Sequence, residues 1–463
     1  MPKVNTRPTT LRELRAGGHV HRSVKAEIQQ NLVARLRSGE PRFPGIVGFD
    51  DTVLPHLERA LLAGHDLVLL GERGQGKSRL IRTLGGLLDE WTPVVDGCEI
   101  NDHPYAPVCV RCRRLLAELG DDLPVAWKHR DERYGEKLAT PDTSVGDLIG
   151  DIDPIKVAEG RTLGDPETVH YGLVPRTNRG IFCVNELPDL AERIQVSLLN
   201  VLEERDVQIR GYNLRLPLDV LLVASANPED YTNRGRIITP LKDRFGAEIR
   251  THYPLDVDDE LVLIGQEAQV SAAVPVHLME VIARFTRLVR ESPAVDTRSG
   301  VSARFAIAAT ETVAASAMRR SAIAGEEQPV ARVCDLPSIV PTLLGKVEFE
   351  VSEEGREDEV LAHLLRRATA ETWRRALGPV DLTGLLDRFD RGATVDSGEL
   401  VPAAELLHRI GPVSGLARIM HSLGMEGESP GHAAAALEFA LEGLYLMRRL
   451  SKDTSDGAST YRI

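Results

Sequence analysis

The chain has 463 residues, with 56 Lys and Arg against 69 Asp and Glu, which gives a formal net charge of −13. This acidic balance argues against a broad nucleic-acid surface, which would need a basic stripe, so nucleic acid is not an expected partner. Five scattered cysteines, the lack of an apolar run of membrane-spanning length and the lack of an apolar signal-peptide core favour a cytoplasmic protein without a membrane span.

Residues 1–42 indicate an N-terminal helical extension. Apolar residues recur there at four-residue steps, as in an amphipathic helix. These residues are Val24, Ile28, Leu32 and Leu36. The segment PRFPGIVG then brings two prolines and two glycines close together, which ends the helical pattern.

Residues 43–254 alternate short apolar runs with helical patterns. The expected strands cover residues 66–70, 180–186 and 219–228, and the expected helices cover residues 78–91 and 192–205. Strands that alternate with helices predict an α/β fold, in which helices flank a parallel sheet. Residues 207–217, VQIRGYNLRLP, predict a short hairpin inserted before the third strand.

The rest of the chain is helical in pattern almost throughout. Amphipathic segments such as HLMEVIARFTRLVRE and EDEVLAHLLRRATAETWRRAL carry this signal. We predict an α-helical lid over residues 255–345 and a further C-terminal helical region over residues 346–463. The last residues, SKDTSDGASTYRI, are polar and predict a loose tail.

The segment GERGQGKS at residues 71–78 matches the phosphate-loop pattern G-x-x-x-x-G-K-[ST] at every fixed position, between an expected strand and an expected helix. Its glycines let backbone N–H groups turn toward phosphate oxygens. The lysine would reach the outer phosphates, and the serine would offer its hydroxyl to Mg²⁺. The residues that we expect to bind ATP are Gly71, Gly74, Gly76, Lys77 and Ser78.

The strand at residues 180–186 ends in Asn185 and Glu186, where two acidic residues would be the usual arrangement. A carboxylate at Glu186 can orient and deprotonate an attacking water. Asn185 stands at the expected Mg²⁺ position, but its amide brings no charge, and Mg²⁺ prefers charged oxygen ligands. Two interpretations stay open: hydrolysis that is slow or weak in Mg²⁺, and nucleotide binding without chemistry.

Three later residues complete the candidate catalytic set. Asn227 ends the third strand and could position water near the γ-phosphate, although an Asn-Pro turn is its alternative role. Arg244, in LKDRF, could reach a neighbouring subunit's nucleotide, with Arg234 and Arg236 as rival candidates. Arg304 lies near the start of a helix in the expected lid and could fold onto the phosphates.

The order of phosphate loop, strand with a terminal Glu, Asn227, DRF and a late helical arginine resembles that of AAA+ ATPases. FPGIVGFDD, YGLVPRTNRGIFCVNE and LLNVLEERDVQIRGYNLRLPLDVLLVASANPED resemble, more closely, the magnesium-chelatase ATPase subunit and the MoxR-like branch. This resemblance implies a homo-oligomeric ring, commonly a hexamer, with nucleotide at each subunit interface. It also implies one role for each candidate: catalytic base for Glu186, first sensor for Asn227, arginine finger for Arg244 and second sensor for Arg304.

The resemblance leaves three functions open. The first is an ATPase ring that remodels or activates a separate protein with a von Willebrand A domain, since this chain lacks that domain's D-x-S-x-S pattern. The second is the ATPase subunit of a chelatase that inserts magnesium or cobalt into a tetrapyrrole. The third is a nucleotide-binding scaffold with little hydrolysis, which only Asn185 favours. A σ54-type activator is less favoured, because the G-A-F-T-G-A loop of those proteins is absent.

The segment CEINDHPYAPVCVRC suggests a zinc site. Cys109 and Cys112 have the C-x₂-C spacing that suits two thiolates on one Zn²⁺, and Cys98 or His103 could complete the site. A single C-x₂-C pair is a weak pattern, so ordinary thiols are the alternative. We expect the other two cysteines, Cys183 and Cys334, to be packing residues.

Overall fold

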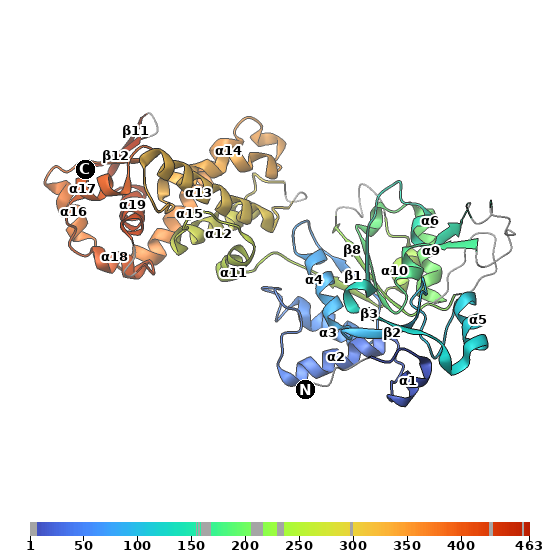
Figure 1. The fold of residues 1–463 in the computed structure, drawn as a ribbon. Helices are drawn as coiled ribbons and strands as arrows, with labels where there is room; N and C mark the ends of the chain where they lie inside the picture. The colour runs from blue at the N-terminus through green and yellow to red at the C-terminus, as the bar shows by residue number, and fades with distance from the viewer. Residues whose placement is uncertain are drawn as a thin grey trace, which may run out of the picture. The chain divides into compact units, whose positions relative to one another are not determined.

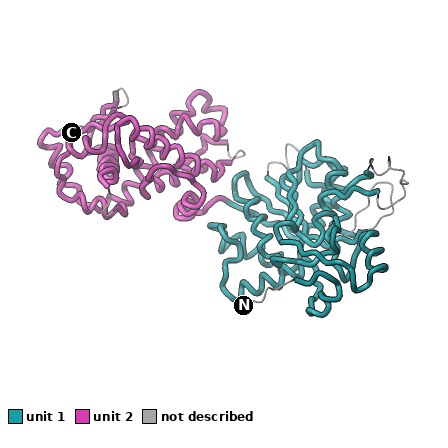
Figure 2. Tube along the Cα trace, in the orientation of Figure 1, with its two compact units in different colours: residues 1–252 teal, residues 253–463 magenta. Residues whose placement is uncertain are grey.

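The computed structural model describes residues 7–153, 168–204, 216–228, 236–296, 300–425, 429–455 and 458–463, together with Ile155 and Ala158. The chain divides into two compact units, Met1–His252 and Tyr253–Ile463 (Figure 2). Arg234 and most of the predicted hairpin at residues 207–217 lie outside the described residues.

The first unit is built on a parallel sheet, as the sequence predicted, and this sheet has five strands, of which three were predicted (Figure 1). The strand order is β4-β7-β8-β1-β9, and every neighbouring pair is parallel. The strands are β1 (Leu67–Leu70), β4 (Tyr134–Leu138), β7 (Gly180–Asn185), β8 (Val220–Ala226) and β9 (Ala247–Arg250). Because β7, β8 and β1 are adjacent and parallel, their carboxyl ends meet at one edge of the sheet.

Helices cover both faces of this sheet. In β1, Leu67 and Leu69 belong to one hydrophobic cluster, and Val68 and Leu70 belong to another on the opposite face. The helices of the first cluster are α2 (Val24–Ser38), α3 (Val53–Leu62) and α4 (Lys77–Thr83), and the second cluster contains α9 (Glu192–Glu203). Since β1, β7 and β8 are buried along their whole length, their sequences are mainly apolar, and the polar residues Asn185 and Ser225 come only near their carboxyl ends.

The N-terminal helices belong to this unit. Val24 and Ile28 of α2 lie in the same hydrophobic cluster as β1. A buried ion pair adds a polar link, because the Arg133 guanidinium donates to both carboxylate oxygens of Glu27, at 2.8 and 2.7 Å. The pair joins α2 to the residue that precedes β4. The shorter α1 (Leu11–Ala16) comes before α2.

Shorter elements complete the first unit. β2 (Trp91–Val95) pairs antiparallel with β3 (Val125–His129), and β5 (Gly150–Ile152) pairs antiparallel with β6 (Val169–Tyr171). The remaining helices are α5 (Val110–Leu119), α6 (Val145–Leu148), α8 (Leu173–Arg176) and α10 (Thr239–Arg244), with 3₁₀ turns at Gly120–Asp122, Arg130–Arg133 and Leu187–Asp189. The predicted helix over residues 78–91 is wrong in its second half. A 3₁₀ turn, Leu84–Leu87, follows α4, because Gly85 and Gly86 disfavour a continued α-helix.

The second unit is mainly helical, and one hydrophobic core runs through it from Ile264 to Tyr461. The predicted lid and the predicted C-terminal region therefore share a core. Its helices are α11 (Val257–Glu267), α12 (Val276–Glu291), α13 (Ala303–Ala324), α14 (Ile339–Leu343), α15 (Glu357–Leu377), α16 (Thr383–Asp390), α17 (Ala403–Ile410), α18 (Leu416–Ser422) and α19 (Pro430–Leu446), with 3₁₀ turns at Val333–Ser338, Leu344–Lys346 and Val351–Glu353. Within the described parts of both units, every helix is too short or too polar to span a membrane.

The prediction of a loose C-terminal tail is wrong. β11 (Ser451–Ser455) and β12 (Ala458–Arg462) pair antiparallel, and β12 also pairs with β10 (Val395–Gly398). Tyr461 of β12 is 1% exposed, and its hydroxyl donates to Glu442 Oε2 at 2.5 Å. Lys452 Nζ of β11 donates to the same oxygen at 2.7 Å. One buried aromatic ring and this polar network order a segment whose composition is otherwise that of a tail.

Replacing Tyr461 with alanine should lower the free energy of unfolding by roughly 3–5 kcal/mol, because the change removes a buried ring from the core. Urea unfolding followed by circular dichroism measures this loss. Ile463→Ala is the matched control, since Ile463 is 61% exposed and its loss should change the stability by only about 0.5 kcal/mol. Equal stabilities for the two variants would contradict the packing of β12.

Candidate nucleotide-binding site

The phosphate loop joins the carboxyl end of β1 to α4. Gly74 and Gly76 have φ angles of 74° and 77°, in the left-handed region that side chains disfavour. At Gly71 the restriction is space, because an added Cβ would lie 2.0 Å from Thr251 Oγ1. The backbone conformation therefore requires Gly74 and Gly76, and the packing of the Thr251 side chain favours Gly71.

A buried glutamine braces this loop from inside. Gln75 Oε1 accepts hydrogen bonds from the backbone N–H of Glu72 at 3.0 Å and from Thr251 Oγ1 at 2.8 Å. Thr251 follows β9 and is itself fixed by a bond from its N–H to the carbonyl oxygen of Leu70, at 2.9 Å. The loop is thus tied to β9, which lies beside β1 in the sheet.

Lys77 points back into the loop and toward β8. Its Nζ donates to the carbonyl oxygens of Gly71 and Glu72, the latter at 2.7 Å, and to Asn227 Oδ1 at 2.8 Å. Asn227 is buried directly after β8. The structure thus brings together the predicted phosphate-binding lysine and the predicted sensor from positions 150 residues apart.

Asn185, at the end of β7, is held by protein partners at both ends of its amide. Its Nδ2 donates to Glu136 Oε1 at 2.5 Å, and its Oδ1 accepts from Ser225 Oγ at 3.1 Å. Glu136 lies on the edge strand β4 and was not predicted. A carboxylate therefore stands one strand away from the position where the sequence lacks one.

Glu136 is ionised and well partnered. Arg82 donates to both of its oxygens, at 2.9 and 3.0 Å, and the Tyr134 hydroxyl donates at 3.0 Å. The Arg82 hydrogen bonds lower the pKa of Glu136. The hydrogen bonds favour the ionised carboxylate, and this contributes to the stability of the folded state. The contribution is fully present above the unfolded-state pKa and is lost as the pH falls through the folded-state pKa. Arg82 lies one helical turn after Ser78 on α4, so the charged pair lies on the Ser78 side of that helix.

Glu186 has a φ of 56°, in the left-handed region where a non-glycine residue is strained by about 1–2 kcal/mol. Its backbone N–H donates to Ser225 Oγ at 3.2 Å. Ser225 thus accepts from Glu186 and donates to Asn185, which fixes both residues relative to β8. Backbone strain of this kind is frequent where a side chain must be held in a functional direction.

The predicted arginines lie on exposed surfaces. Arg244, at the end of α10, pairs with Glu203 and Asp243, each at 2.9 Å. Bonding to Glu203 raises the pKa of Arg244. Arg236 is exposed, and its backbone carbonyl oxygen accepts a hydrogen bond from Gln195 Nε2 at 3.0 Å. Arg304 is exposed in the first turn of α13, in the second unit.

The described residues fit a nucleoside triphosphate with Mg²⁺. The acceptors of Lys77 on Gly71, Glu72 and Asn227 are neutral oxygens, and phosphate oxygens, being charged, would be stronger partners for the same ammonium group. Ser78 is partly buried beside it at the start of α4 and offers a hydroxyl to the metal. Asn185 supplies no charge there, so Glu136 and Glu186 are the nearby acids that the structure describes.

The predicted zinc ligands come together only in part. The sulfur atoms of Cys98, Cys109 and Cys112 and a carboxylate oxygen of Asp102 lie within 4.8 Å of one another. His103 lies apart from them, because its Nε2 is 3.3 Å from His19 Nε2 and its Nδ1 accepts the Tyr105 N–H at 3.0 Å. Asp102, which the C-x₂-C pattern does not reveal, takes the fourth position.

Replacing Asn185 with aspartate should lower stability at neutral pH by about 1–3 kcal/mol, because two carboxylates would then face each other where the amide now donates. Their repulsion raises a carboxyl pKa in the folded state. The loss of stability should therefore grow as the pH rises from 5 to 8 and shrink again on acidification. Thermal unfolding at several pH values measures it.

The double variant Asn185→Asp/Glu136→Gln is the matched control. It exchanges amide and carboxylate and keeps a hydrogen bond between the two positions, so it should regain most of the stability at pH 8. A single variant that is as stable as the double variant at every pH would contradict the contact between Asn185 and Glu136.

Comparisons with known proteins match about half of the chain. The family model described as the sigma-54 interaction domain matches residues 161–244, a segment that contains Glu186, Asn227 and Arg244. The magnesium-chelatase 38 kDa subunit of Cereibacter sphaeroides is 29% identical over 235 residues, covering 48% of this chain and 62% of the relative. The corresponding subunit of Rhodobacter capsulatus is 33% identical over 245 residues, covering 50% of this chain and 64% of the relative.

A solved structure of the complex between subunits BchI and BchD of magnesium chelatase is 23% identical, covers 69% of this chain and 98% of that chain, and has a TM-score of 0.36. The chain spans less than two thirds of the length of both curated relatives. The phosphate loop, the parallel sheet and these sequence relatives agree with one another. Over about half of its length the chain is similar to the magnesium-chelatase 38 kDa subunits, and its first unit combines a phosphate loop with a parallel sheet.

Proposed function

We propose that this chain binds ATP with Mg²⁺ at the phosphate loop and hydrolyses it. The observation that carries this proposal is the bond from Lys77 to Asn227, because it gathers the phosphate-binding lysine and a γ-phosphate sensor at one edge of the sheet. When bound, Mg²⁺ would offset phosphate charge. Lys77 holds the outer phosphates, Asn227 orients the attacking water, and Glu186 accepts its proton.

We further propose that the chain acts as a homo-oligomeric ring, commonly a hexamer in such ATPases. In the ring, Arg244 of one subunit would face the nucleotide of the next, and Arg304 would act as the second sensor. The exposure of Arg244 supports this proposal. Its ion pairs with Glu203 and Asp243 lie at the surface, where such pairs contribute little free energy, so Arg244 can exchange them for a phosphate. All five cysteines are free, which favours a reducing compartment such as the cytoplasm.

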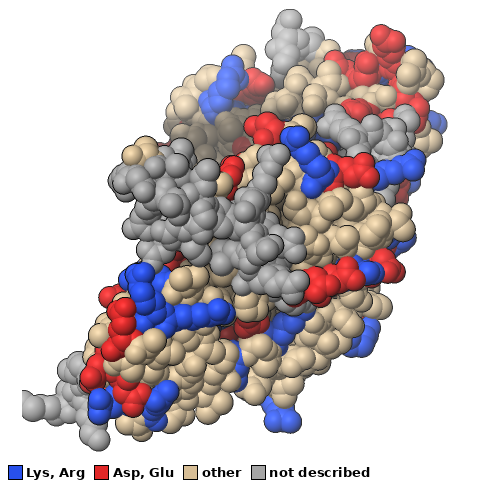
Figure 3. All heavy atoms as spheres, turned by 90° about the vertical axis from the view of Figure 1, so that its right-hand side faces the viewer, with Lys and Arg blue, Asp and Glu red and all other residues tan. Residues whose placement is uncertain are grey.

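The partner that we propose is a separate protein with a von Willebrand A domain, which the ring would remodel or activate as in MoxR-like systems. A protein partner also suits the surface. On the face drawn in Figure 3, basic and acidic side chains are interspersed around an uncharged area, and the described atoms form no continuous basic stripe. Such a face does not favour nucleic acid.

A second candidate is the ATPase subunit of a chelatase that inserts magnesium or cobalt into a tetrapyrrole. The names of the curated relatives favour it, since both are magnesium-chelatase subunits. A third candidate, a nucleotide-binding scaffold with little turnover, rests on Asn185. Turnover by the chain alone distinguishes the third candidate from the other two. Stimulation by a tetrapyrrole or by a von Willebrand A-domain protein distinguishes the first two.

The full chain should release phosphate from ATP in the presence of Mg²⁺, and Glu186→Gln should abolish this release while ATP still binds. Lys77→Ala should weaken ATP binding by about 10- to 100-fold, because a charge-assisted hydrogen bond is lost. Phosphate release and fluorescent-ATP binding are the measurements. Lys346→Ala, which changes an exposed lysine of the second unit, is the control. Wild-type release no faster than that of Glu186→Gln would leave the scaffold as the function.

Mixing two inactive variants tests the arginine finger. Arg244→Ala subunits keep Glu186, and Glu186→Gln subunits keep Arg244, so a mixed ring should contain complete sites and recover part of the turnover. We expect a maximum in the phosphate-release rate near equal amounts of the two variants. If the phosphate-release rate of the mixtures never exceeds that of the separate variants, Arg244 does not act across a subunit interface.

A further inference from the structure

Residues 96–109 connect β2 to α5 with little regular structure. The segment has turns and one isolated bridge, between His103 and Ala106. It is nevertheless buried at Asp102 and at Cys109, which are 1% and 5% exposed. A buried segment without a helix or a sheet ladder needs another source of order, because its backbone entropy is lost on folding.

The side chains at the centre of this segment form a compact set of metal ligands. The sulfur atoms of Cys98, Cys109 and Cys112 and one Asp102 oxygen all lie within 4.8 Å of one another. In a tetrahedral zinc site with Zn–S bonds of about 2.3 Å, the sulfur atoms are about 3.8 Å apart. The described spacing is therefore that of ligands around one ion, with only small adjustments needed.

Backbone N–H groups point at these ligand atoms. The N–H of Cys112 donates to Cys109 Sγ and the N–H of Asp102 donates to Cys98 Sγ, both at 3.3 Å. The N–H of Cys109 donates to Asp102 Oδ2 at 2.9 Å. Donors in these positions stabilise negative charge on sulfur and oxygen, which is the form in which both bind a metal.

One carboxylate oxygen of Asp102 marks a place where a further partner would be stabilising. Asp102 Oδ1 is buried and has no hydrogen-bond partner among the described residues. A buried acceptor without a partner costs about 1–3 kcal/mol, and more when it is charged. A cation bound at this oxygen would remove that cost.

We propose that Cys98, Asp102, Cys109 and Cys112 bind one Zn²⁺ as a structural site. Soft thiolate ligands select zinc over magnesium or calcium, which prefer oxygen. Four protein ligands leave no open position, as in structural rather than catalytic zinc sites. The ligands carry more negative charge than one Zn²⁺ offsets, and the Arg111 guanidinium, which donates to Cys112 Sγ at 3.9 Å, reduces the excess.

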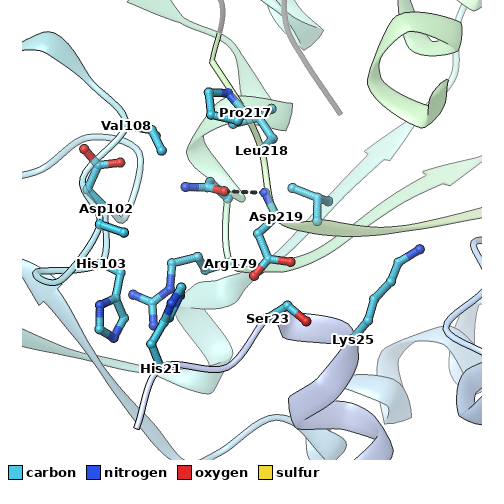
Figure 4. Close-up of a pocket in the computed structure, with 13 residues that line it drawn as sticks. His21, Ser23, Lys25, Asp102, His103, Val108, Arg179, Pro217, Leu218 and Asp219 are labelled. Carbon is cyan, nitrogen blue, oxygen red and sulfur yellow. Dashed lines mark hydrogen bonds between the residues drawn. The ribbon is translucent and has the colours of Figure 1, made fainter. Parts of the chain in front are cut away.

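The zinc would fix one wall of a cavity of about 450 Å³. Asp102 and His103 both line this cavity, and their side chains point in opposite directions (Figure 4). Asp102 turns toward the cysteines, and His103 stacks on His19 and contacts the His21 ring at a tilt. The ion would therefore hold the backbone that separates the sulfur cluster from the histidine cluster. This inference does not depend on ATP hydrolysis.

The full chain, purified from zinc-supplemented cells without a metal-chelating resin, should contain about one zinc per chain by elemental analysis. Replacing the zinc with Co²⁺ should give the visible absorption of tetrahedral thiolate-bound cobalt. Removal of the metal with a chelator should lower the melting temperature, since a ligand that binds only the folded state stabilises it.

Cys109→Ser/Cys112→Ser should abolish zinc binding, and Cys334→Ser, which changes a cysteine of the second unit, should leave it unchanged. If the double variant does not fold, Asp102→Asn keeps all three thiols and should raise the zinc Kd about tenfold or more, because loss of an outer-shell partner alone costs that much. A wild-type chain that takes up no zinc after reduction, that contains iron instead, or that pairs these cysteines in a disulfide would overturn the proposal. So would a double variant that retains zinc.

Discussion

The hydrogen bond from Lys77 to Asn227 is the contact on which the candidate site rests. It exists because β1 lies beside β8 in a parallel sheet, so that the residues following both strands meet at one edge. Thr251, after β9, holds the same loop from the other side through Gln75. Since three neighbouring strands fix the loop, the phosphate-binding lysine is placed by the core of the domain rather than by the loop alone.

A second chain of contacts runs along the neighbouring strands. Glu136 on β4, Asn185 on β7 and Ser225 on β8 are linked in that order by hydrogen bonds. The neutral amide therefore does not leave the edge of the sheet without negative charge, because the charge lies one strand further out, on Glu136. This arrangement keeps two carboxylates from facing each other at close range, and it leaves Glu186 to serve alone as the proposed base. Loss of chemistry is thus not a necessary consequence of Asn185.

The sequence revealed the strands that are buried on both sides and missed those at the edges. β1, β7 and β8 are mainly apolar, whereas β4 (YGEKL) and β9 (AEIR) are partly exposed and carry charges. Glu136 was missed for that reason. Asp102 was missed because C-x₂-C spacing says nothing about which distant side chain folds onto the pair. The C-terminal strands were missed because a single buried tyrosine gives no periodicity. In each case the deciding contact joins residues that are far apart in the sequence, so a local sequence pattern cannot reveal it.

Residues 96–109, the cysteine segment, are connected to the candidate site through β7. Asn101, in the cysteine segment, donates to the carbonyl oxygens of Arg176 and Asn178, at 2.8 and 3.2 Å, just before β7 begins. Arg179 returns the contact by donating to the carbonyl oxygen of Asn101 at 3.4 Å, and it also donates to that of Pro93 on β2 at 2.7 Å. The opposite end of the same strand carries Asn185 and Glu186. A buried strand of six residues, paired on both sides, moves as a rigid element. Zinc bound by residues 98–112, which contact the segment that leads into β7, would therefore act on the proposed chemistry by fixing where this strand lies.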